Sequence, residues 1–247
     1  MRWLILAIML SAGPPAVHAS GLEEARAGLA AAQRGDDDEA LRRYSAAIAA
    51  GDLSPFNVML AYHNRGNTYQ DKGDYRQAIP EYRTAIKLQP VYAEAWFARG
   101  RAWFSLGEYA NAMVDFAQSL KLDPADAYAA LWLHLARRKS APSDAGELSR
   151  NAVKFDRTMW PGPLLGLYLG EATPQQVRAA SQRGDAATRK DQACEAAFYI
   201  AEYELLRNNM AAAGSLFREA AMICPYTSDE RDGAAVELNR NQFPQVK

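Results

Sequence analysis

The sequence predicts an all-α solenoid of stacked antiparallel helix pairs, with an irregular helical segment before the last pair. Two observations lead to this prediction. Landmark residues recur at intervals of 34 positions, and apolar residues between them recur every three or four positions, as on one face of a helix. With 49% hydrophobic and 23% charged residues, the composition is that of a globular chain whose repeats can share a core.

The two clearest repeat units cover residues 59–92 and 93–126. Gly66 and Gly100 are 34 residues apart, and so are Pro90 and Pro124. Six further positions keep the same spacing: Gly73 and Gly107, Tyr75 and Tyr109, Ala78 and Ala112, Tyr82 and Phe116, Ala85 and Ser119, Leu88 and Leu122. We expect each glycine to let the first helix of a pair approach the alanine (Ala78 or Ala112) of the second. The aromatic ring would then fill the space between pairs, and the proline would end the unit.

At these offsets the chain resembles the tetratricopeptide repeat family, whose unit is a pair of antiparallel helices. Further units are predicted on the same template within a single domain, residues 20–247. They are 21–54, a degenerate unit 127–156, an irregular helical insert 157–193, a last pair 194–227 and a capping helix 228–240. Ser54 and Pro55 supply an N-cap and a first helical position, which adds one turn before the second unit.

The irregular part has its own local signals. Asp144 with Glu147, and Thr173 with Gln176, have the spacing of a capping box, so we expect helices to about Phe155 and about Gln182. Residues 160–163, Trp-Pro-Gly-Pro, should break the chain between these two helices.

Residues 1–19 have the pattern of a secretory signal peptide. Arg2 precedes a short apolar run from Leu4 to Leu10, and the small residues Val17 and Ala19 precede the expected cleavage after Ala19. An uncleaved anchoring helix is the alternative. The chain has no cysteine before Cys194, so no thiol near the cleavage site can accept a lipid. We therefore expect a periplasmic or secreted protein without a stable membrane anchor.

Cys194 opens the first helix of the last predicted pair and Cys224 closes its second helix. Antiparallel helices bring these two ends together, and exported proteins meet oxidising conditions, so we predict a Cys194–Cys224 disulfide. A loop of this size would contribute about 3 to 4 kcal/mol in the chain-entropy model. Two reduced, buried thiols are the alternative.

Composition and motifs exclude several classes of function. A net charge of −1 argues against a general nucleic-acid binder and against a polybasic membrane patch. The chain has no motif of a known catalytic or phosphate-binding site, and after cleavage only His63 and His134 could serve as histidine ligands. We therefore predict no catalytic residue, no metal and no cofactor. The acidic run at residues 36–39 and the basic run at 137–139 are interpreted as the charged ends of helices.

In stacked helix pairs the first helices line a concave groove, which commonly binds peptides or partner domains. Projection of the repeat geometry places the following candidate binding residues in that groove: His63, Asn67, Gln70, Phe97, Arg101, Phe104 and Tyr128. Arg65 and Arg99 are expected to pair with carboxylates between helices, and Trp96, Trp103 and Trp132 to belong to the core.

A second resemblance covers nearly the whole mature chain. Residues 131–136 (Leu-Trp-Leu-His-Leu-Ala), Trp160, residues 167–170 (Leu-Tyr-Leu-Gly), Phe198 and Tyr199 are similar to the bacterial new lipoprotein I family. That family is a dimeric envelope adaptor that brings a periplasmic protease to a peptidoglycan hydrolase. The resemblance implies a non-catalytic adaptor with such a protein or peptide partner and makes a homodimer one expectation.

Two other functions remain open from the sequence. One is an enzyme or small-ligand-binding protein that uses a pocket in the irregular segment, residues 139–182. A compact cluster of His63 or His134 with carboxylates would favour it. The other is a purely structural oligomer.

Overall fold

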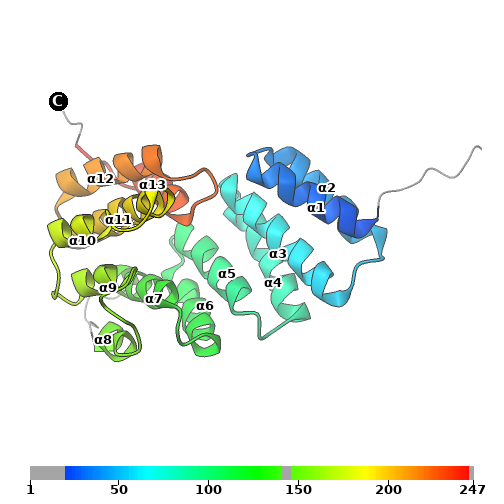
Figure 1. Cartoon of the computed structure of the whole chain (residues 1–247). Coiled ribbons are helices and arrows are strands. Elements are labelled where there is room, and N and C mark those ends of the chain that lie inside the picture. The colour runs from blue at the N-terminus through cyan, green and yellow to red at the C-terminus, as the bar shows by residue number, and fades with distance from the viewer. Residues whose placement is uncertain (1–19, 141–145, 245–247) are drawn as a thin grey trace, which may run out of the picture.

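The computed structural model describes residues 20–140 and 146–244, and the regular elements of this part are all helices. The first six form three antiparallel pairs that stack side by side (Figure 1). The pairs are α1 (Gly21–Gln33) with α2 (Asp37–Ala50), α3 (Pro55–Asp71) with α4 (Tyr75–Leu88), and α5 (Ala93–Ser105) with α6 (Tyr109–Leu122). The predicted fold class, an α-solenoid of stacked helix pairs, is confirmed.

Seven helices follow, and the first of them, α7, continues the stack on α6 (Figure 1). They are α7 (Ala127–Ser140), α8 (Gly146–Ala152), α9 (Gly162–Tyr168), α10 (Pro174–Ala180), α11 (Ala186–Leu206), α12 (Met210–Ile223) and α13 (Asp229–Arg240). The last pair begins at Ala186 and not at Cys194 as predicted. Asp185 caps the longer helix, since its carboxylate accepts from the backbone N–H of Thr188 at 2.8 Å.

Two of the predicted helix starts are confirmed by their caps. The Ser54 hydroxyl accepts from the N–H of Asn57, and Pro55 is the first residue of α3. Thr173 and Gln176 form the predicted capping box at the start of α10, which ends at Ala180. The other predicted capping box, Asp144 with Glu147, lies outside the described residues, as do residues 1–19 with the predicted signal peptide.

Glycine and an aromatic ring set the distance between the helices of a pair. A Cβ atom on Gly66 would lie 2.7 Å from the Tyr82 ring, and one on Gly100 would lie 2.7 Å from the Phe116 ring. The sequence predicted an approach to the small alanine of the second helix, but the atoms nearest to each glycine belong to the aromatic ring. The ring itself occupies the space that each glycine leaves open, and Gly28 repeats the arrangement against Tyr44.

The main core joins α5, α6 and α7 to the last pair. Trp132 stacks on Phe198 of α11 with ring centroids 5.6 Å apart, and it also contacts Phe104 at 5.0 Å. Trp132 is 3% exposed, which confirms its predicted place in the core. The Tyr168 hydroxyl of α9 donates to the carbonyl of Tyr199 at 2.7 Å. The irregular insert is therefore packed against α11 and is part of the same body.

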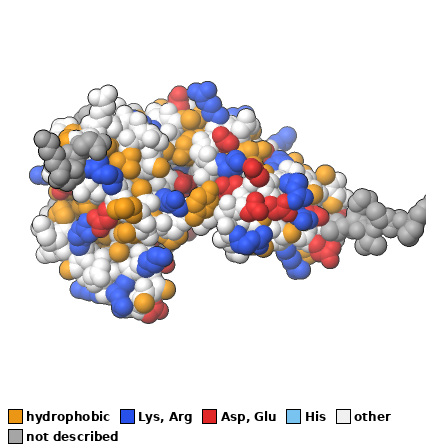
Figure 2. All heavy atoms as spheres, turned by 90° about the horizontal axis from the view of Figure 1, so that it is seen from above, with side chains coloured by type: hydrophobic (Ala, Val, Ile, Leu, Met, Phe, Trp, Pro, Cys, Tyr) orange, Lys and Arg blue, Asp and Glu red, His pale blue; other side chains and the backbone are white. Residues whose placement is uncertain are grey.

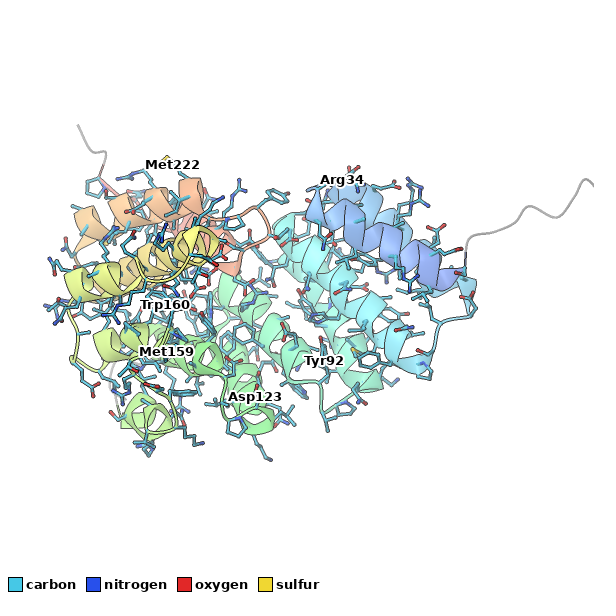
Figure 3. All side chains as sticks on the ribbon, viewed as in Figure 1. Arg34, Tyr92, Asp123, Met159, Trp160 and Met222 are labelled. Carbon is cyan, nitrogen blue, oxygen red and sulfur yellow. A yellow bond between two sulfur atoms is a disulfide. The ribbon has the colours of Figure 1, made fainter. Side chains whose placement is uncertain are left out.

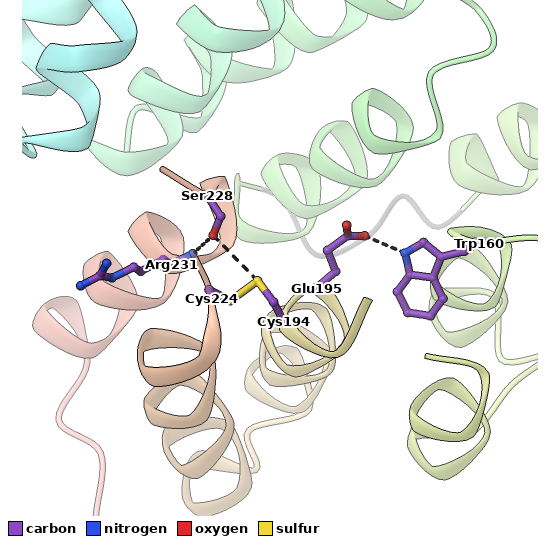
Figure 4. The surroundings of a disulfide bond; sticks show 6 residues. All are labelled: Trp160, Cys194, Glu195, Cys224, Ser228 and Arg231. Carbon is purple, nitrogen blue, oxygen red and sulfur yellow. Dashed lines mark hydrogen bonds between the residues drawn. A yellow bond between two sulfur atoms is a disulfide. The ribbon is translucent and has the colours of Figure 1, made fainter. Parts of the chain in front are cut away.

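The two cysteines form a disulfide that ties the middle of α11 to the end of α12 (Figure 4). The Cα atoms of Cys194 and Cys224 are 4.9 Å apart. Beside the bond, the Ser228 hydroxyl lies 3.8 Å from the Cys194 sulfur and accepts from the N–H of Arg231, which caps α13. The disulfide therefore also fixes the point at which α13 begins.

The surface of the molecule carries interspersed charges of both signs in the view from above (Figure 2). Among the described residues, none of the helices combines the length and the apolar character that crossing a membrane requires.

Candidate partner-binding surface

The predicted binding residues lie on α3, α5 and α7, the first helices of their pairs. We call the side that these three helices share the inner surface. Two arginines beside it are occupied by ion pairs within their own helix pairs. Arg65 binds Glu81 through two hydrogen bonds of 2.8 and 3.0 Å, and Arg99 binds Asp115, one repeat further on, through two of 2.7 Å. The prediction that these arginines pair with carboxylates between helices is confirmed.

The C-terminal segment from Tyr226 to Arg240 lies across the inner surface. The Tyr226 hydroxyl donates to Asp37 of the first pair at 2.7 Å, and Arg101 of α5 forms an ion pair with Asp229. At the other end of α13, Arg240 donates to the carbonyls of Phe104 and Ser105, at 3.3 and 2.9 Å. In Figure 1 the loop before α13 reaches toward the first helix pairs. The solenoid is thus closed by its own C-terminus.

This arrangement goes beyond the cap that the sequence predicts. Ala234 of α13 is fully buried, and a Cβ atom on Gly233 would lie 2.6 Å from the Phe198 ring, so α13 does cover the last pair. Its polar side also closes part of the inner surface. The acidic first turn of α13 and Arg240 are the residues that the sequence interpretation missed.

A buried ion cluster holds α13 to α7 and α11. The Lys139 ammonium lies 3.0 Å from carboxylate oxygens of both Glu202 and Glu237, and Arg240 binds Glu237 at 2.6 Å. Burial raises the pKa of Glu202 to about 7, although Lys139 opposes this rise. Burial alone would lower the pKa of Lys139, but the two carboxylates hold it above its ordinary value. The basic end of α7 therefore has a structural role in which Lys139 pairs with two buried acids.

Four of the seven candidate residues are buried inside the protein. His63, Gln70, Arg101 and Phe104 are 5%, 3%, 8% and 2% exposed. With its amide oxygen facing Arg101, Gln70 accepts from both terminal nitrogens of that guanidinium, at 2.8 and 3.1 Å. Arg101 is also covered by Asp229, and Phe104 by Trp132 and the end of α13. These four side chains support the closed arrangement and are not available to a partner in this conformation.

His63 is packed between aromatic rings. Its ring lies 5.7 Å from that of Tyr82 and 5.4 Å from that of Tyr92, and its Nε2 is 3.3 Å from the Asn67 amide nitrogen. Burial, together with the nearby Arg101, lowers the pKa of His63 to about 4. His63 is therefore neutral at neutral pH, and no carboxylate hydrogen-bonds to it among the contacts of the described residues.

Asn67, Phe97 and Tyr128 are half-buried and line cavities. Asn67 accepts a hydrogen bond of 2.9 Å from the Tyr82 hydroxyl and borders a cavity of about 190 Å³ beside Gln70 and Arg101. Phe97 and Tyr128 belong to a larger cavity of about 540 Å³ between α5, the start of α7, α11 and the start of α13. The structure thus divides the predicted groove into two hollows and keeps Phe97 and Tyr128 together in the larger one.

We call this larger cavity the acidic pocket. Phe97, Tyr128 and Trp132 form its aromatic part, and the carboxylates around it belong to Glu94, Asp123, Asp126, Glu195, Asp229 and Glu230. The Tyr128 hydroxyl and the Trp160 indole N–H both donate to Oε2 of Glu195, at 2.6 and 2.7 Å. Figure 3 shows Trp160 beside α11 and Asp123 at the end of α6. Glu195 and Trp160 were not among the predicted site residues.

The irregular segment contributes a separate cavity of about 310 Å³. His134, Tyr168 and Tyr203 line it together with Arg138 and Arg207, and its described lining includes no carboxylate. His134 lies edge-to-face against Tyr168 with ring centroids 5.5 Å apart. Within the described ranges, His, Cys, Asp and Glu residues form no group that could hold a metal ion.

The acidic run at residues 36–39 lies at the start of a helix, as the sequence analysis predicted. Asp36 is the N-cap of α2, with its carboxylate accepting from the N–H of Glu39 at 3.3 Å, and the next three residues form the acidic first turn. Acidic side chains at this end favour the helix dipole.

The start of α13 brings buried carboxylates together and should make stability depend on pH. Burial and the nearby Asp71 raise the pKa of Asp232 to about 8, although Arg101 and Arg231 oppose this. Burial likewise raises the pKa of Asp71 to about 6. The folded chain therefore keeps protons that the unfolded chain loses between about pH 4 and pH 8, so the free energy of unfolding falls as the pH rises through this range.

We expect Asp232→Asn to remove much of this fall, because an amide needs no proton to be neutral. Relative to the unchanged protein, the variant should be more stable at pH 8 by a few kcal/mol, on the order of the linkage energy of one such group, and nearly equal at pH 4. Urea unfolding at the two pH values measures the difference. Asp74→Asn, at an exposed carboxylate, is the control; a pH profile unchanged by Asp232→Asn contradicts the assignment.

Comparison with known proteins agrees with this geometry. The tetratricopeptide repeat family model matches residues 63–128, the two clearest repeats and the start of α7. A tetratricopeptide repeat protein from Parabacteroides merdae has a similar structure, with a TM-score of 0.53 at 17% identity over 89% of this chain and 84% of that one. The C-terminal part of a TPR repeat-containing protein from Cytophaga hutchinsonii has a TM-score of 0.49 at 21% identity, and the match covers 89% of this chain and 75% of that one. The first TPR of Spaghetti bound to an HSP90 peptide has a TM-score of 0.46 at 24% identity, and the match covers 49% of this chain and 94% of that one.

These findings define the class of the fold. The chain is an α-solenoid of stacked helix pairs, in which residues 63–128 match the tetratricopeptide repeat family model and a helical C-terminal part packs back onto the repeats.

Proposed function

We propose that this protein is a non-catalytic scaffold that binds a protein or peptide partner on the open part of its inner surface. The observation that carries the proposal is the acidic pocket, in which Phe97 and Tyr128 from two successive inner helices face one cavity of about 540 Å³. Aromatic side chains at the centre of a concave surface are typical anchors for a partner. The repeat architecture supports the proposal because such solenoids present extended concave surfaces for binding.

The proposed site of action is the periplasm or the cell exterior, after cleavage behind Ala19. The signal pattern at residues 1–19 supports export, and the Cys194–Cys224 pair suits an oxidising compartment. We further propose an adaptor role in the cell envelope, with a periplasmic protease or a peptidoglycan hydrolase as partner, on the basis of the resemblance to the new lipoprotein I family.

Affinity capture from native periplasmic extract tests the proposal. The tagged protein should retain a specific partner, and Phe97→Ala should reduce its recovery by at least tenfold, as expected for loss of an aromatic anchor. Val114→Ala, on the outer helix of the same pair and 66% exposed, is the matched control and should leave capture unchanged. Phe104 is unsuitable for this test because it is buried in the core. Equal recovery with Phe97→Ala would show that the partner, if any, binds elsewhere.

A further inference from the structure

The acidic pocket has an excess of negative charge that the chain itself does not neutralise. Six carboxylates line it, and its lining contains no lysine, arginine or histidine. Asp229 forms an ion pair with Arg101, which is not itself a lining residue of the pocket. Asp126 accepts from the N–H groups of Tyr128 and Ala129 at the start of α7, which satisfies it locally. Glu94, Glu195 and Glu230 form no ion pair within the described part of the chain, although the nearby charge of Arg101 acts to lower the pKa of Glu230.

Hydrogen bonds orient the central carboxylate and leave one of its oxygens available. Both donors to Glu195, the Tyr128 hydroxyl and the Trp160 N–H, bind the same atom, Oε2. The other oxygen, Oε1, accepts no hydrogen bond among the described residues. Because Glu195 is held in place before any ligand arrives, a donor entering the pocket meets an acceptor that need not be ordered first.

One wall of the pocket already binds a guanidinium. The Arg101 guanidinium carbon lies 5.5 Å from the centroid of the Phe97 ring, and the same group pairs with Asp229. Phe97 and Asp229 are both lining residues. Arg101 thus provides an internal example of the recognition that the aromatic rings and carboxylates of this pocket can offer, since a guanidinium stacks on aromatic faces while it binds carboxylates.

We infer that the acidic pocket binds an arginine side chain of an extended basic segment in the partner protein. Charge complementarity favours this occupant, because a cation would relieve the repulsion among carboxylates that are crowded around an apolar floor. Arginine fits better than lysine, since its planar group can stack on Tyr128 or Phe97 and donate to Glu195 at the same time. Burial and the proximity of Glu195 raise the pKa of Glu230 to about 7, which is consistent with this crowding. The inference rests on the proposed function and specifies its partner.

Direct binding of a short peptide tests the inference. The probe is a fluorescein-labelled Ser-Arg-Gly-Arg-Ser peptide, and the comparison peptide carries citrulline in place of both arginines, which keeps the shape and removes the charge. By fluorescence anisotropy at low salt, we expect the full chain to bind the arginine peptide at least about tenfold more tightly than the citrulline peptide. Equal binding of the two peptides would overturn the inference.

Matched variants locate the binding. Glu94→Gln combined with Asp123→Asn removes two exposed carboxylates from the pocket, and asparagine can still accept the bond of 3.0 Å from the Ala125 N–H that Asp123 accepts. This double variant should weaken arginine-peptide binding about fivefold or more. Glu108→Gln removes an exposed carboxylate at the residue before α6, outside the pocket, and should have no effect. An equal effect of the two changes would overturn the assignment to this pocket.

The native-capture experiment and the peptide-binding experiment test the two proposals independently. If native capture depends on Phe97 but the arginine peptide does not bind, the proposed function stands and the inference about the partner's chemistry is wrong. If the arginine peptide binds in the pocket but native capture is insensitive to Phe97→Ala, the pocket chemistry stands and the proposed docking surface is wrong.

Discussion

Lys139→Met is expected to be the most destabilising single substitution considered for this chain. It removes the ammonium from between Glu202 and Glu237, whose side chains are 0% and 1% exposed, and a methionine of similar length refills the space. Breaking a buried ion pair at one partner typically costs about 3–5 kcal/mol, because the remaining charge stays buried without compensation. Arg240 still neutralises Glu237, so most of the cost falls on Glu202. The thermal midpoint should fall by roughly 10 °C at pH 8.

The pH dependence of this loss identifies its cause. Burial already raises the pKa of Glu202 to about 7 in the folded protein, so at pH 5 its carboxyl carries a proton and needs no cation. The destabilisation by Lys139→Met should therefore be smaller at pH 5 than at pH 8. Adding Glu202→Gln to Lys139→Met should restore part of the stability at pH 8, since no buried charge is then left unpaired.

A matched control separates the buried cluster from an ordinary surface pair. Lys72 binds Asp38 at 2.6 Å, but the Asp38 side chain is 87% exposed, so Lys72→Met should leave the midpoint nearly unchanged. Thermal unfolding by circular dichroism measures all three variants. Equal midpoints for Lys139→Met and the unchanged protein would show that α13 is held by other contacts. In hydrogen exchange, residues 229–240 should lose protection in the Lys139→Met variant before α3–α6 do.

Repeated local patterns explain why the regular half of the fold could be predicted. The 34-residue spacing places Gly66, Tyr82 and their counterparts on facing helices, and Arg65 and Arg99 pair as expected because each pair lies within one unit. The pattern specifies which positions meet, but it leaves open which side chain fills the space. For this reason the sequence analysis predicted Ala78 as the neighbour of Gly66 and missed the ring of Tyr82.

The closed inner surface could not be predicted, because it depends on contacts without local periodicity. Tyr226 and Asp37 are 189 positions apart, and Arg240 and Tyr109 are 131 positions apart. The apolar side of α13, with Ala234 and Leu238, allowed the sequence analysis to predict that this helix covers the last pair. The polar side of α13 carries no pattern that would predict its contact with the inner surface. Arg101 and Phe104 are therefore covered by a segment that the projection of the repeats did not include, whereas His63 is buried between the rings of Tyr82 and Tyr92. Phe97 and Tyr128 remain together because they come from neighbouring helices of the regular stack.

The start of the last pair shows the opposite error, in which a local signal was present but was given too little weight. Asp185 precedes Thr188 by the three residues that a capping carboxylate needs, and the helix does begin there. The template placed the start at Cys194 because the cysteine was taken as the first residue of the unit. The disulfide pairing did not depend on that boundary. The prediction of the disulfide required only that the two helices be antiparallel and close together. This condition is met by α11 and α12.

Loss of the Cys194–Cys224 bond is the second change with a large expected effect. The bond closes a loop with a sequence separation of 30, and in the chain-entropy model such a crosslink stabilises the folded state by about 3–4 kcal/mol. The effect should extend beyond the last pair, because Ser228 lies against the Cys194 sulfur and caps α13, whose other contacts close the inner surface. Removing the crosslink therefore frees the start of α13 as well as the end of α12 from the middle of α11.

The double variant Cys194→Ala/Cys224→Ala measures this effect without leaving an unpaired thiol or burying a hydroxyl. Its thermal midpoint should be roughly 10 °C lower than that of the unchanged protein, and the reductant dithiothreitol should lower the midpoint of the unchanged protein toward the same value. Dithiothreitol should not change the midpoint of the double variant, which controls for other effects of the reagent. Titration of denatured, unreduced protein should find no free thiol. Two free thiols would show that the chain folds without the bond.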